Sequence, residues 1–297
     1  MRRACIDIGS NTTRLLVAEC HDEQLHEVHQ ERVFTRIGGS LLPDGSIPAD
    51  KLMEVAETVG CQLRCAQELG AADTRGVATA AVRRATNADS LLAAIDAACG
   101  LRIDILGAEE EARLAFVGAA GTLGRVPSGA LGVVDVGGGS SELVVGTAPD
   151  RVSWCASFGL GSGDLADRFL RSDPPSRNEL ARARDHVAGV LGGVDAPQPV
   201  EAVAVGGSAT SLGRFAGPIL DAGAFAHSLG LLAGERVADL ARRFALAPER
   251  VRLLPAGLLI LQGASDTLGV ALAIGHGGLR EGVLLEAGGR NPGRVGS

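Results

Sequence analysis

The sequence has almost no lysine and no tyrosine. Lys51 is the single lysine among 28 basic residues, so the positive charge of this 297-residue chain is carried by arginine. A Walker A loop requires Gly-Lys followed by Ser or Thr, and the sequence has no such motif. Any phosphate group bound by this chain must therefore be held by arginines, backbone amides or a metal ion.

Aromatic residues and long apolar runs are also scarce. Aromatics make up 3% of the chain, which leaves no stacking platform for single-stranded nucleic acid. The formal net charge of −7 argues against general affinity for nucleic acids or anionic membranes. No apolar run approaches the roughly 20 residues that span a bilayer. The N-terminus turns acidic at Asp7 and lacks a signal-peptide cleavage pattern. We expect neither nucleic acid nor membrane as a partner.

The six cysteines form no C-x-x-C pair. Cys61 and Cys65 fall four residues apart within a helical pattern, and we expect them to be buried thiols on a helix face rather than metal ligands. His21, His26 and His29 lie near a predicted hairpin, but no cysteine or acidic set completes a tetrahedral zinc pattern. A reducing, cytoplasmic location is the default expectation.

Glycine, by contrast, is abundant, and one glycine-rich pattern occurs twice. "VVDVGGGSSELVVG" (133–146) and "CIDIGSNTTRLLV" (5–17) both read as an apolar strand with an Asp near its end, a turn of small residues and a second strand. Bare amides at such a turn can cradle an anion, although the glycines could also serve only to supply positive φ. The duplication predicts two similar halves, each opening with a β-hairpin.

The remaining pattern alternates strands and helices in both halves. In the first half we expect an extended stretch at 26–37, a helix at about 49–69, a strand at 75–79, a helix at 87–98, a strand at 102–106 and a helix at 109–119. The Gly/Pro/Ser-rich loop 121–130 divides the chain into domains 1–125 and 126–297. In the second half we expect strands at 131–136, 142–147, 151–157, 200–205 and 269–274, and helices near 162–171, 176–191, 234–245, 255–265 and 278–286. This order predicts two α/β domains facing a cleft.

Such an architecture resembles the actin, sugar-kinase and 70-kDa chaperone superfamily. Five stretches of sequence indicate which family of that superfamily the chain resembles. They are "DIGSNTTRLLV" (7–17), "ATAAVRRATN" (78–87), "ILGAEEEARL" (105–114), "DVGGGSSELVVG" (135–146) and "GGLREGVLLE" (277–286). In this order they are similar to the signatures of the exopolyphosphatase/pppGpp phosphohydrolase (Ppx/GppA) family, in its short, two-domain form. The resemblance implies two actin-like domains flanking an interdomain cleft. It also implies a homodimer that uses Mg²⁺ or Mn²⁺ to release terminal phosphate from inorganic polyphosphate or from pppGpp. Because the net charge is −7, we expect short polyphosphate chains to be favoured over long ones.

The resemblance also implies roles for acidic residues. The family motif places its catalytic carboxylate immediately before an Ala-Arg pair, which maps to Glu111 as the general base; helical periodicity alone does not separate Glu111 from Glu110. For Glu109 we expect a structural pair with Arg113, four residues later. Glu142 is expected to be a second acid that holds metal or water.

Two aspartates are candidate metal ligands. Asp7 and Asp135 end the inner strands of the two hairpins and could coordinate Mg²⁺, which takes one or two carboxylates and keeps several waters. The alternative is that each carboxylate only caps neighbouring amides of its hairpin.

A larger set is expected to bind phosphate through amides, hydroxyls and guanidinium groups. Arg83 and Asn87 match the family pattern A-x-R-x-x-x-N. The other members are Ser10, Asn11, Thr12, Arg14, Arg36, Gly137, Gly138, Gly139, Ser140, Ser141, Gly207 and Ser208.

Three features stay open at this point. The turn at Gly206-Gly207 could bind a nucleotide, bind further phosphates or simply pack a helix on the sheet. Arg280 could be structural, pairing with Glu281, or functional. His276 stands where family members often carry Asp, which puts any polar role there in doubt.

Two other functions fit the same scaffold. One is an ATP-dependent kinase or ATPase, and the other is a non-catalytic sensor of polyphosphate or alarmone. Glu111 and Asp135 argue against the sensor, and phosphate release without an acceptor would distinguish a hydrolase from a kinase.

Overall fold

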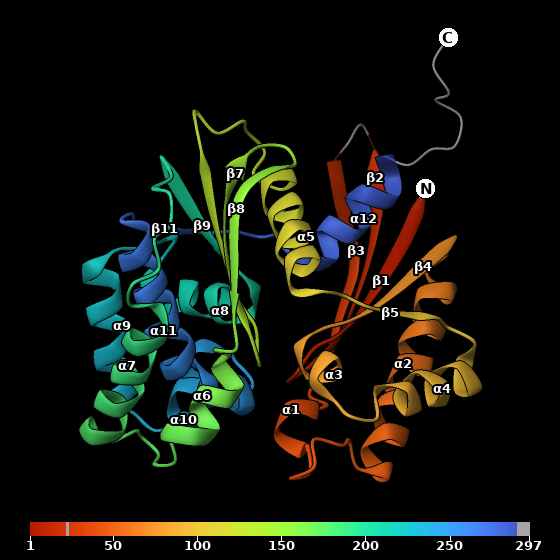
Figure 1. Ribbon diagram of the computed structural model, residues 1–297, viewed down its shortest axis with the longest axis horizontal. Helices are drawn as coiled ribbons and strands as arrows, with labels where there is room; N and C mark the ends of the chain where they lie inside the picture. Colours follow the sequence, from red (N-terminus) through yellow and green to blue (C-terminus); the bar gives the residue numbers. More distant parts are fainter. Residues whose placement is uncertain (22–23, 290–297) are drawn as a thin grey trace. The chain divides into compact units, whose positions relative to one another are not determined.

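The structure, a computed structural model, describes residues 1–21 and 24–289 (Figure 1). Its internal contacts divide the chain into two compact units, Met1–Gly124 with Gly277–Ser297, and Arg125–His276. Each unit is built on one mixed β-sheet with helices.

The sheet of the first unit has the strand order β3-β2-β1-β4-β5. Its first three strands form antiparallel hairpins, and β1, β4 and β5 run parallel. The strands are β1 (Arg2–Ile8), β2 (Thr13–His21), β3 (Gln24–Val33), β4 (Asp73–Ala78) and β5 (Ile103–Ile105).

Alternation along the strands gives this sheet two apolar faces. On one face Ile6, Leu15 and Val17 pack in a core with helices α2 and α4. On the other face Cys5 and Leu16 pack in a core with α5 and α12. The helices of this unit are α1 (Ile37–Ser40), α2 (Ala49–Glu68), α3 (Ala80–Arg84), α4 (Ala88–Cys99), α5 (Ala108–Gly121) and α12 (Leu279–Gly289).

The closing helix α12 belongs to the first unit, whereas the sequence division placed residues 277–286 in the second domain. The reason is a close crossing of α5 and α12, visible in Figure 1. A Cβ on Gly118 would collide with the backbone of Gly278, and one on Gly282 would collide with the backbone of Leu114. Glycines on both helices allow the backbones to touch, and Leu279, Val283 and Leu284 are thereby buried.

The sheet of the second unit has the order β10-β11-β9-β6-β7-β8. Antiparallel strands β6, β7 and β8 are followed by the parallel strands β9 and β11. The order β8-β7-β6-β9-β11 thus repeats β3-β2-β1-β4-β5 of the first unit, as expected from the duplicated hairpin. The strands are β6 (Leu131–Val136), β7 (Ser141–Thr147), β8 (Arg151–Phe158), β9 (Glu201–Val205), β10 (Ile219–Leu220) and β11 (Leu272–Ile274).

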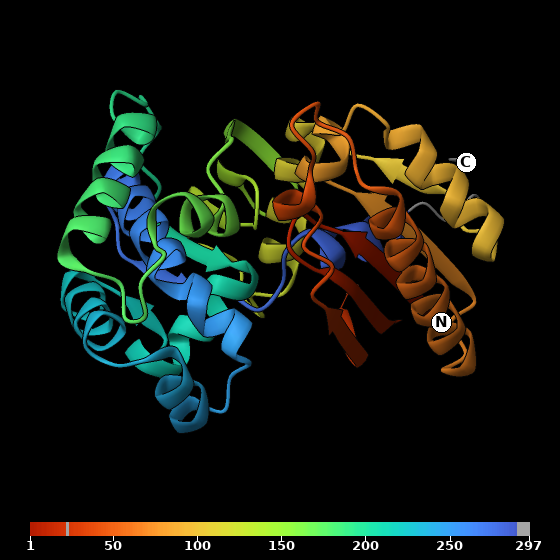
Figure 2. The same ribbon diagram turned by 90° about the horizontal axis from the view of Figure 1, so that it is seen from below.

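One large core joins the helices of this unit to its sheet. The central helix is α11 (Pro248–Leu268), which contacts α6, α7, α8, α9 and α10 (Figure 2). The others are α6 (Ser162–Phe169), α7 (Arg177–Leu191), α8 (Gly206–Ala216), α9 (Ala222–Gly234) and α10 (Val237–Phe244).

The structure corrects two helix predictions in the second unit. The predicted helix at 255–265 is longer in the structure: α11 starts at Pro248 and carries Pro255, a residue that usually breaks helices, in its interior. Burial on many sides stabilises α11 enough to tolerate the proline. Helix α9 was not predicted, because its three glycines give weak helix propensity; Asp221 caps it by accepting from the Ala224 amide at 2.8 Å.

The structure also corrects the predicted burial of two cysteines. Cys61 is exposed and Cys65 is half-buried, so they are not the pair of buried thiols expected from their spacing. Among the residues that the structure describes, no helix is long and apolar enough to cross a membrane.

Candidate active site

The two glycine turns predicted to match have the same backbone geometry. In the first unit the Gly9 amide donates to the Thr12 carbonyl at 3.0 Å, and in the second the Gly137 amide donates to the Ser140 carbonyl at 3.0 Å. A Cβ on either glycine would lie 3.1 Å from that carbonyl oxygen. The sequence alignment of the two turns therefore holds residue by residue.

Backbone amides at the start of a nearby helix donate hydrogen bonds to the carbonyls of each turn. This helix is α1, after β3, in the first unit and α6, after β8, in the second. The Gly38 amide of α1 donates to the Ser10 carbonyl at 2.8 Å, and the Arg36 amide donates to the Asn11 carbonyl at 3.1 Å. The Gly163 amide of α6 donates to the Gly138 carbonyl at 2.9 Å in the same manner. Fixing the turn carbonyls on this side fixes the peptide planes, and with them the orientation of the turn amides.

The strand register of the first unit aligns one acid and two arginines. Asp7 lies opposite Arg14, and Arg14 lies opposite Arg32, so the three side chains share one face of the sheet. Burial raises the pKa of Asp7, and the positive charges of Arg14 and Arg280 oppose that rise. Arg32 is exposed overall, but desolvation of its guanidinium, with the neighbouring positive charges of Arg14 and Arg280, lowers its pKa to about 10. We call Asp7, Arg14 and Arg32 the basic row.

The corresponding positions of the second unit carry acids. Asp135 lies opposite Glu142, and Glu142 lies opposite Ser157, whose hydroxyl donates to Glu142 Oε1 at 2.8 Å. The side chain of Glu142 is buried, with the residue 2% exposed. We call Asp135, Glu142 and Ser157 the acidic row.

The backbone beside Asp135 is shaped around its carboxylate. Gly206 follows β9, the strand next to Asp135, and has φ +84°. A Cβ on Gly206 would lie 2.6 Å from Asp135 Oδ1, so any other residue would displace the acid. Two carboxylates on paired positions of neighbouring strands fit a hard divalent cation such as Mg²⁺, which prefers oxygen ligands.

A second acidic group lies on α5 of the first unit. Glu111 is 8% exposed in the first turn of the helix, and Arg83 Nη1 donates to its Oε2 at 2.9 Å. The same Nη1 donates to the Leu106 carbonyl at 2.6 Å, which holds the guanidinium in place. The structure thus brings together two residues that sequence analysis treated separately.

The adjacent acids of α5 have different surroundings. Glu110 accepts two hydrogen bonds from Arg113, at 2.8 and 2.7 Å, and Arg113 also pairs with Glu286 of α12 at 2.6 Å. The hydrogen bonds that Arg113 donates to Glu110 raise the pKa of Arg113. The expected partner of Arg113 was Glu109, but Glu110 takes that place because its carboxylate, unlike that of the exposed Glu109, shares the side of α5 with α12. Glu110 is therefore structural, a distinction that helical periodicity left open.

Other predicted phosphate ligands are engaged within the first unit. The Asn87 amide both accepts from the Ile47 N–H at 2.8 Å and donates to the Ile47 carbonyl at 3.0 Å, tying a loop to α4. Arg14 Nε donates to the Thr12 hydroxyl at 3.0 Å. Arg36 is exposed and has φ 49°, a left-handed conformation that is costly for a residue other than glycine.

The third glycine turn contacts the helix layer. Ser208 is 0% exposed and lies against Gly257 of α11, and a Cβ on Gly207 would lie 2.7 Å from the guanidinium of the buried Arg250. In the second unit Ser141 donates to the Leu160 carbonyl at 2.5 Å and is fully buried. For Gly207 and Ser208 these contacts favour the packing alternative.

The structure also shows the surroundings of Arg280 and His276, whose roles the sequence left undecided. Arg280 Nη1 donates to the Leu15 carbonyl at 3.1 Å, and its Nη2 lies 3.9 Å from Glu281, which favours a structural role. His276 is exposed. Arg32 was not among the predicted residues, because the pairing of β2 with β3 that aligns it with Arg14 depends on strand register.

Comparison with known proteins gives the family. The sequence matches the Ppx/GppA phosphatase family over residues 16–290. It is 28% identical to Exopolyphosphatase 1 of Mycobacterium leprae over 96% of this chain and 89% of that protein. It is also 28% identical to a guanosine-5'-triphosphate,3'-diphosphate pyrophosphatase of Aeromonas hydrophila, over 97% of this chain and 60% of that one.

The fold is also similar to that of a solved structure from the same family. The Aquifex aeolicus Ppx/GppA family member superposes with a TM-score of 0.82 and 28% identity, covering 98% of this chain and 99% of that one. The predicted class, α/β with two actin-like domains, is confirmed by this match and by the repeated strand order. With a family match over nearly its whole length and the five motifs in order, the chain belongs to the Ppx/GppA phosphatase family.

Proposed function

We propose that this protein is an exopolyphosphatase, which hydrolyses the terminal phosphoanhydride of inorganic polyphosphate with the help of Mg²⁺ or Mn²⁺. The observation that carries the proposal is the division of charge between two matching turns, a basic row beside one and an acidic row beside the other. Phosphoryl transfer needs both positive charge for the phosphate oxygens and a metal ion held by acids. The likeness to the Mycobacterium leprae exopolyphosphatase supports this reading.

Glu111 is the proposed general base. Its carboxylate is largely buried and is oriented by the hydrogen bond from Arg83, so it can accept a proton from an attacking water. Glu110 is unsuited to this role because Arg113 occupies both of its oxygens. Arg83 then has two functions, orienting the base and offering charge to a phosphoryl group.

The acidic row is the proposed metal site. Asp135 and Glu142 would hold the ion, with Ser157 fixing the Glu142 carboxylate. The ion would supply charge that stabilises the phosphate oxygens during bond cleavage. Asp7, proposed from the sequence as a further ligand, has a buried Oδ1 with no hydrogen-bond partner among the described residues, which leaves that oxygen able to accept a ligand water.

The phosphate-binding groups are proposed at the turn amides of Ser10, Asn11, Thr12 and Gly138 to Ser140, with Arg14 and Arg36 beside the first turn. The Gly137 amide, predicted from the sequence to join them, is already bonded to the Ser140 carbonyl. Arg32 joins them through its place in the basic row. Asn87 and Ser141 act through the backbone contacts that they make, and hold the neighbouring loops.

The test is phosphate release from polyphosphate, with no acceptor present, in Mg²⁺ and in EDTA. We expect release that needs the metal. Glu111→Gln should lower turnover at least ~10²-fold, the scale of a positioned general base, while substrate binding persists. Glu110→Gln is the matched control and should retain turnover. Normal turnover in Glu111→Gln with an inactive Glu110→Gln would contradict the assignment, and transfer only to an acceptor would indicate a kinase.

A second substrate, pppGpp, is supported by the likeness to the Aeromonas hydrophila pyrophosphatase. Both compounds present a terminal phosphoanhydride, and the same assay with each as substrate ranks them. We further propose a homodimer in the cytoplasm. The described cysteines are all free thiols, consistent with a reducing compartment, and sedimentation at several concentrations tests the dimer.

A further inference from the structure

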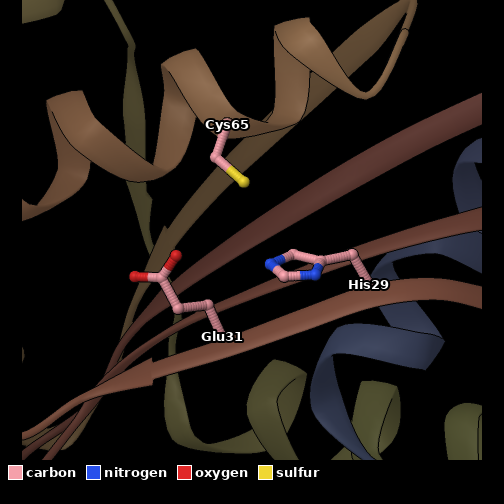
Figure 3. A group of neighbouring side chains, drawn as sticks. All are labelled: His29, Glu31 and Cys65. Carbon is pink, nitrogen blue, oxygen red and sulfur yellow. The ribbon is translucent and has the colours of Figure 1, made fainter.

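Three potential metal ligands meet beside the edge strand of the first unit. His29 and Glu31 lie on β3, and Cys65 lies on α2, which crosses above them in Figure 3. One ligand atom from each residue lies within 4.8 Å of the other two. The spacing of the histidines predicted no zinc site, because Cys65 is far from His29 along the chain and only the fold brings it near.

The strand register explains why these side chains face α2. His29 pairs with Val17 and Glu31 pairs with Leu15, so both point to the face on which Val17 and Leu15 pack with the α2 core. β3 is the edge strand of its sheet. The apolar core between the sheet and α2 ends at this edge strand, so the polar side chains of His29 and Glu31 face α2 there. Arg32 alternates with Glu31 and points to the opposite face, so this cluster is separate from the basic row.

Two atoms in this region are buried without a hydrogen-bond partner among the described residues. One is Nε2 of His29, and the other is Oε1 of Gln62. The Nε2 of Gln62, one helical turn before Cys65, lies 3.5 Å from Glu31 Oε1 and donates to the Thr13 carbonyl at 3.3 Å. Gln62 thus holds the Glu31 carboxylate, and a buried imidazole nitrogen with no donor or acceptor is suited to bind a metal.

The local charge also favours a cation. The carboxylates of Glu31 and Glu68 lie near the Cys65 thiol and give this region negative charge. The same negative charges attract a metal ion. On binding, the thiol releases its proton to solvent and its sulfur becomes a thiolate ligand.

We propose that His29, Glu31 and Cys65 form a Zn²⁺ site that joins β3 to α2, with water as the fourth ligand. Imidazole nitrogen, thiolate and carboxylate are the ligands that Zn²⁺ takes in tetrahedral sites. A thiolate is a poor ligand for Mg²⁺, so this site would not take the ion expected at the acidic row. Zn²⁺ here would tie the edge strand to the helix layer and raise the thermal stability of the first unit.

The test is a titration of the intact protein with Co²⁺, which reports a thiolate ligand through a charge-transfer band in the near ultraviolet. We expect a band that saturates at one equivalent and disappears when Zn²⁺ is added. Cys65→Ala should abolish it, and His29→Ala should weaken binding by more than the roughly 10–100-fold that loss of an outer-shell partner costs. Cys61→Ala on the same helix and His26→Ala on the same strand are the matched controls and should keep the band.

Thermal unfolding gives a second readout. Zn²⁺ should raise the melting temperature of the wild type and of Cys61→Ala, and leave that of Cys65→Ala unchanged, while circular dichroism checks that each variant is folded. Mg²⁺-dependent activity of Cys65→Ala should equal that of the wild type. Absence of a thiolate band in the wild type, or equal Zn²⁺ binding by the wild type and Cys65→Ala, would overturn the proposal.

Discussion

At the scale of single residues, the same position in two copies of one hairpin has acquired opposite charge. Arg14 and Glu142 occupy equivalent places opposite Asp7 and Asp135, and they define the basic and acidic rows. An arginine beside Asp7 competes with a metal for that carboxylate, whereas a glutamate beside Asp135 adds a ligand. We therefore expect the acidic row of the second unit to bind a metal ion more tightly than the basic row of the first.

This difference makes a prediction about Asp135. Asp135→Asn removes one charged ligand and should raise the Mg²⁺ concentration that gives half-maximal activity, by at least about 10-fold for loss of a direct ligand. A Mg²⁺ titration of phosphate release measures the effect, with the exposed Asp150→Asn as control. An unchanged titration curve would favour the alternative that Asp135 only caps the amides of its hairpin.

At the scale of elements, caps and glycine contacts decide how helices begin and cross. Helix α7 begins with a capping box in which the Glu179 carboxylate accepts from the Ser176 amide at 2.8 Å and from the Arg171 and Ser172 amides at 2.9 and 3.0 Å. These hydrogen bonds lower the pKa of Glu179 from 4.5 to about 2, and the bond from the Ser176 amide has the largest effect.

The capping box gives a pH prediction. Because the folded pKa lies below the ordinary value, the stabilising effect of Glu179 is complete above pH 4.5 and is lost as the pH falls towards about 2. Glu179→Gln should therefore lower the urea midpoint of the second unit at neutral pH and reduce its decline on acidification. Trp154, the single tryptophan, lies in this unit and reports its unfolding by fluorescence. If the wild type and Glu179→Gln lose stability in parallel with falling pH, the cap is unimportant; the exposed Glu57→Gln is the control.

The crossing of α5 and α12 gives a prediction about packing. Gly282→Ala places a methyl group against the Leu114 backbone and should cost about 1–3 kcal/mol or more of stability in the first unit. Gly189→Ala in α7 is the matched control, because nothing lies within 4 Å of the added Cβ, and it should be neutral or stabilising. Circular dichroism in urea follows both, with Trp154 fluorescence unchanged in Gly282→Ala. Equal midpoints for the two variants would mean that the helices can separate without cost.

At the scale of the whole molecule, charge limits how a long polyanion can be held. The net charge is −7, and two arginines of the predicted motifs are already engaged, Arg83 by Glu111 and Arg113 by Glu110 and Glu286. Holding a long polyphosphate through successive cuts needs many cationic contacts, each weakened by salt.

We therefore expect distributive hydrolysis that favours short chains. A gel of partially digested long-chain polyphosphate should show a ladder of intermediates as the whole population shortens. Full-length substrate that persists beside free phosphate, with nothing between, would show a processive enzyme and would require a basic track beyond these arginines.

Much of the architecture was predictable because it depends on local pattern. Alternating apolar residues defined most of the strands, and the repeated Asp-x-Gly turn predicted two equivalent hairpins whose backbone bonds prove to be the same. The motif around Glu111 singled out one acid of three as the predicted base. That role stays a prediction, and the hydrogen bonds from Arg113 to both oxygens of Glu110 favour Glu111 over Glu110.

The sequence by itself thus determined the class of fold, the duplication and most candidate residues, since periodicity and turn chemistry act over a few neighbouring positions. Tertiary structure alone decided that α12 completes the first unit, that Arg32 joins Arg14 and that Cys65 meets His29. Each of these depends on strand register or on a close helix contact between residues distant in the chain. Such contacts are fixed by the packing of the whole core, which no local pattern records.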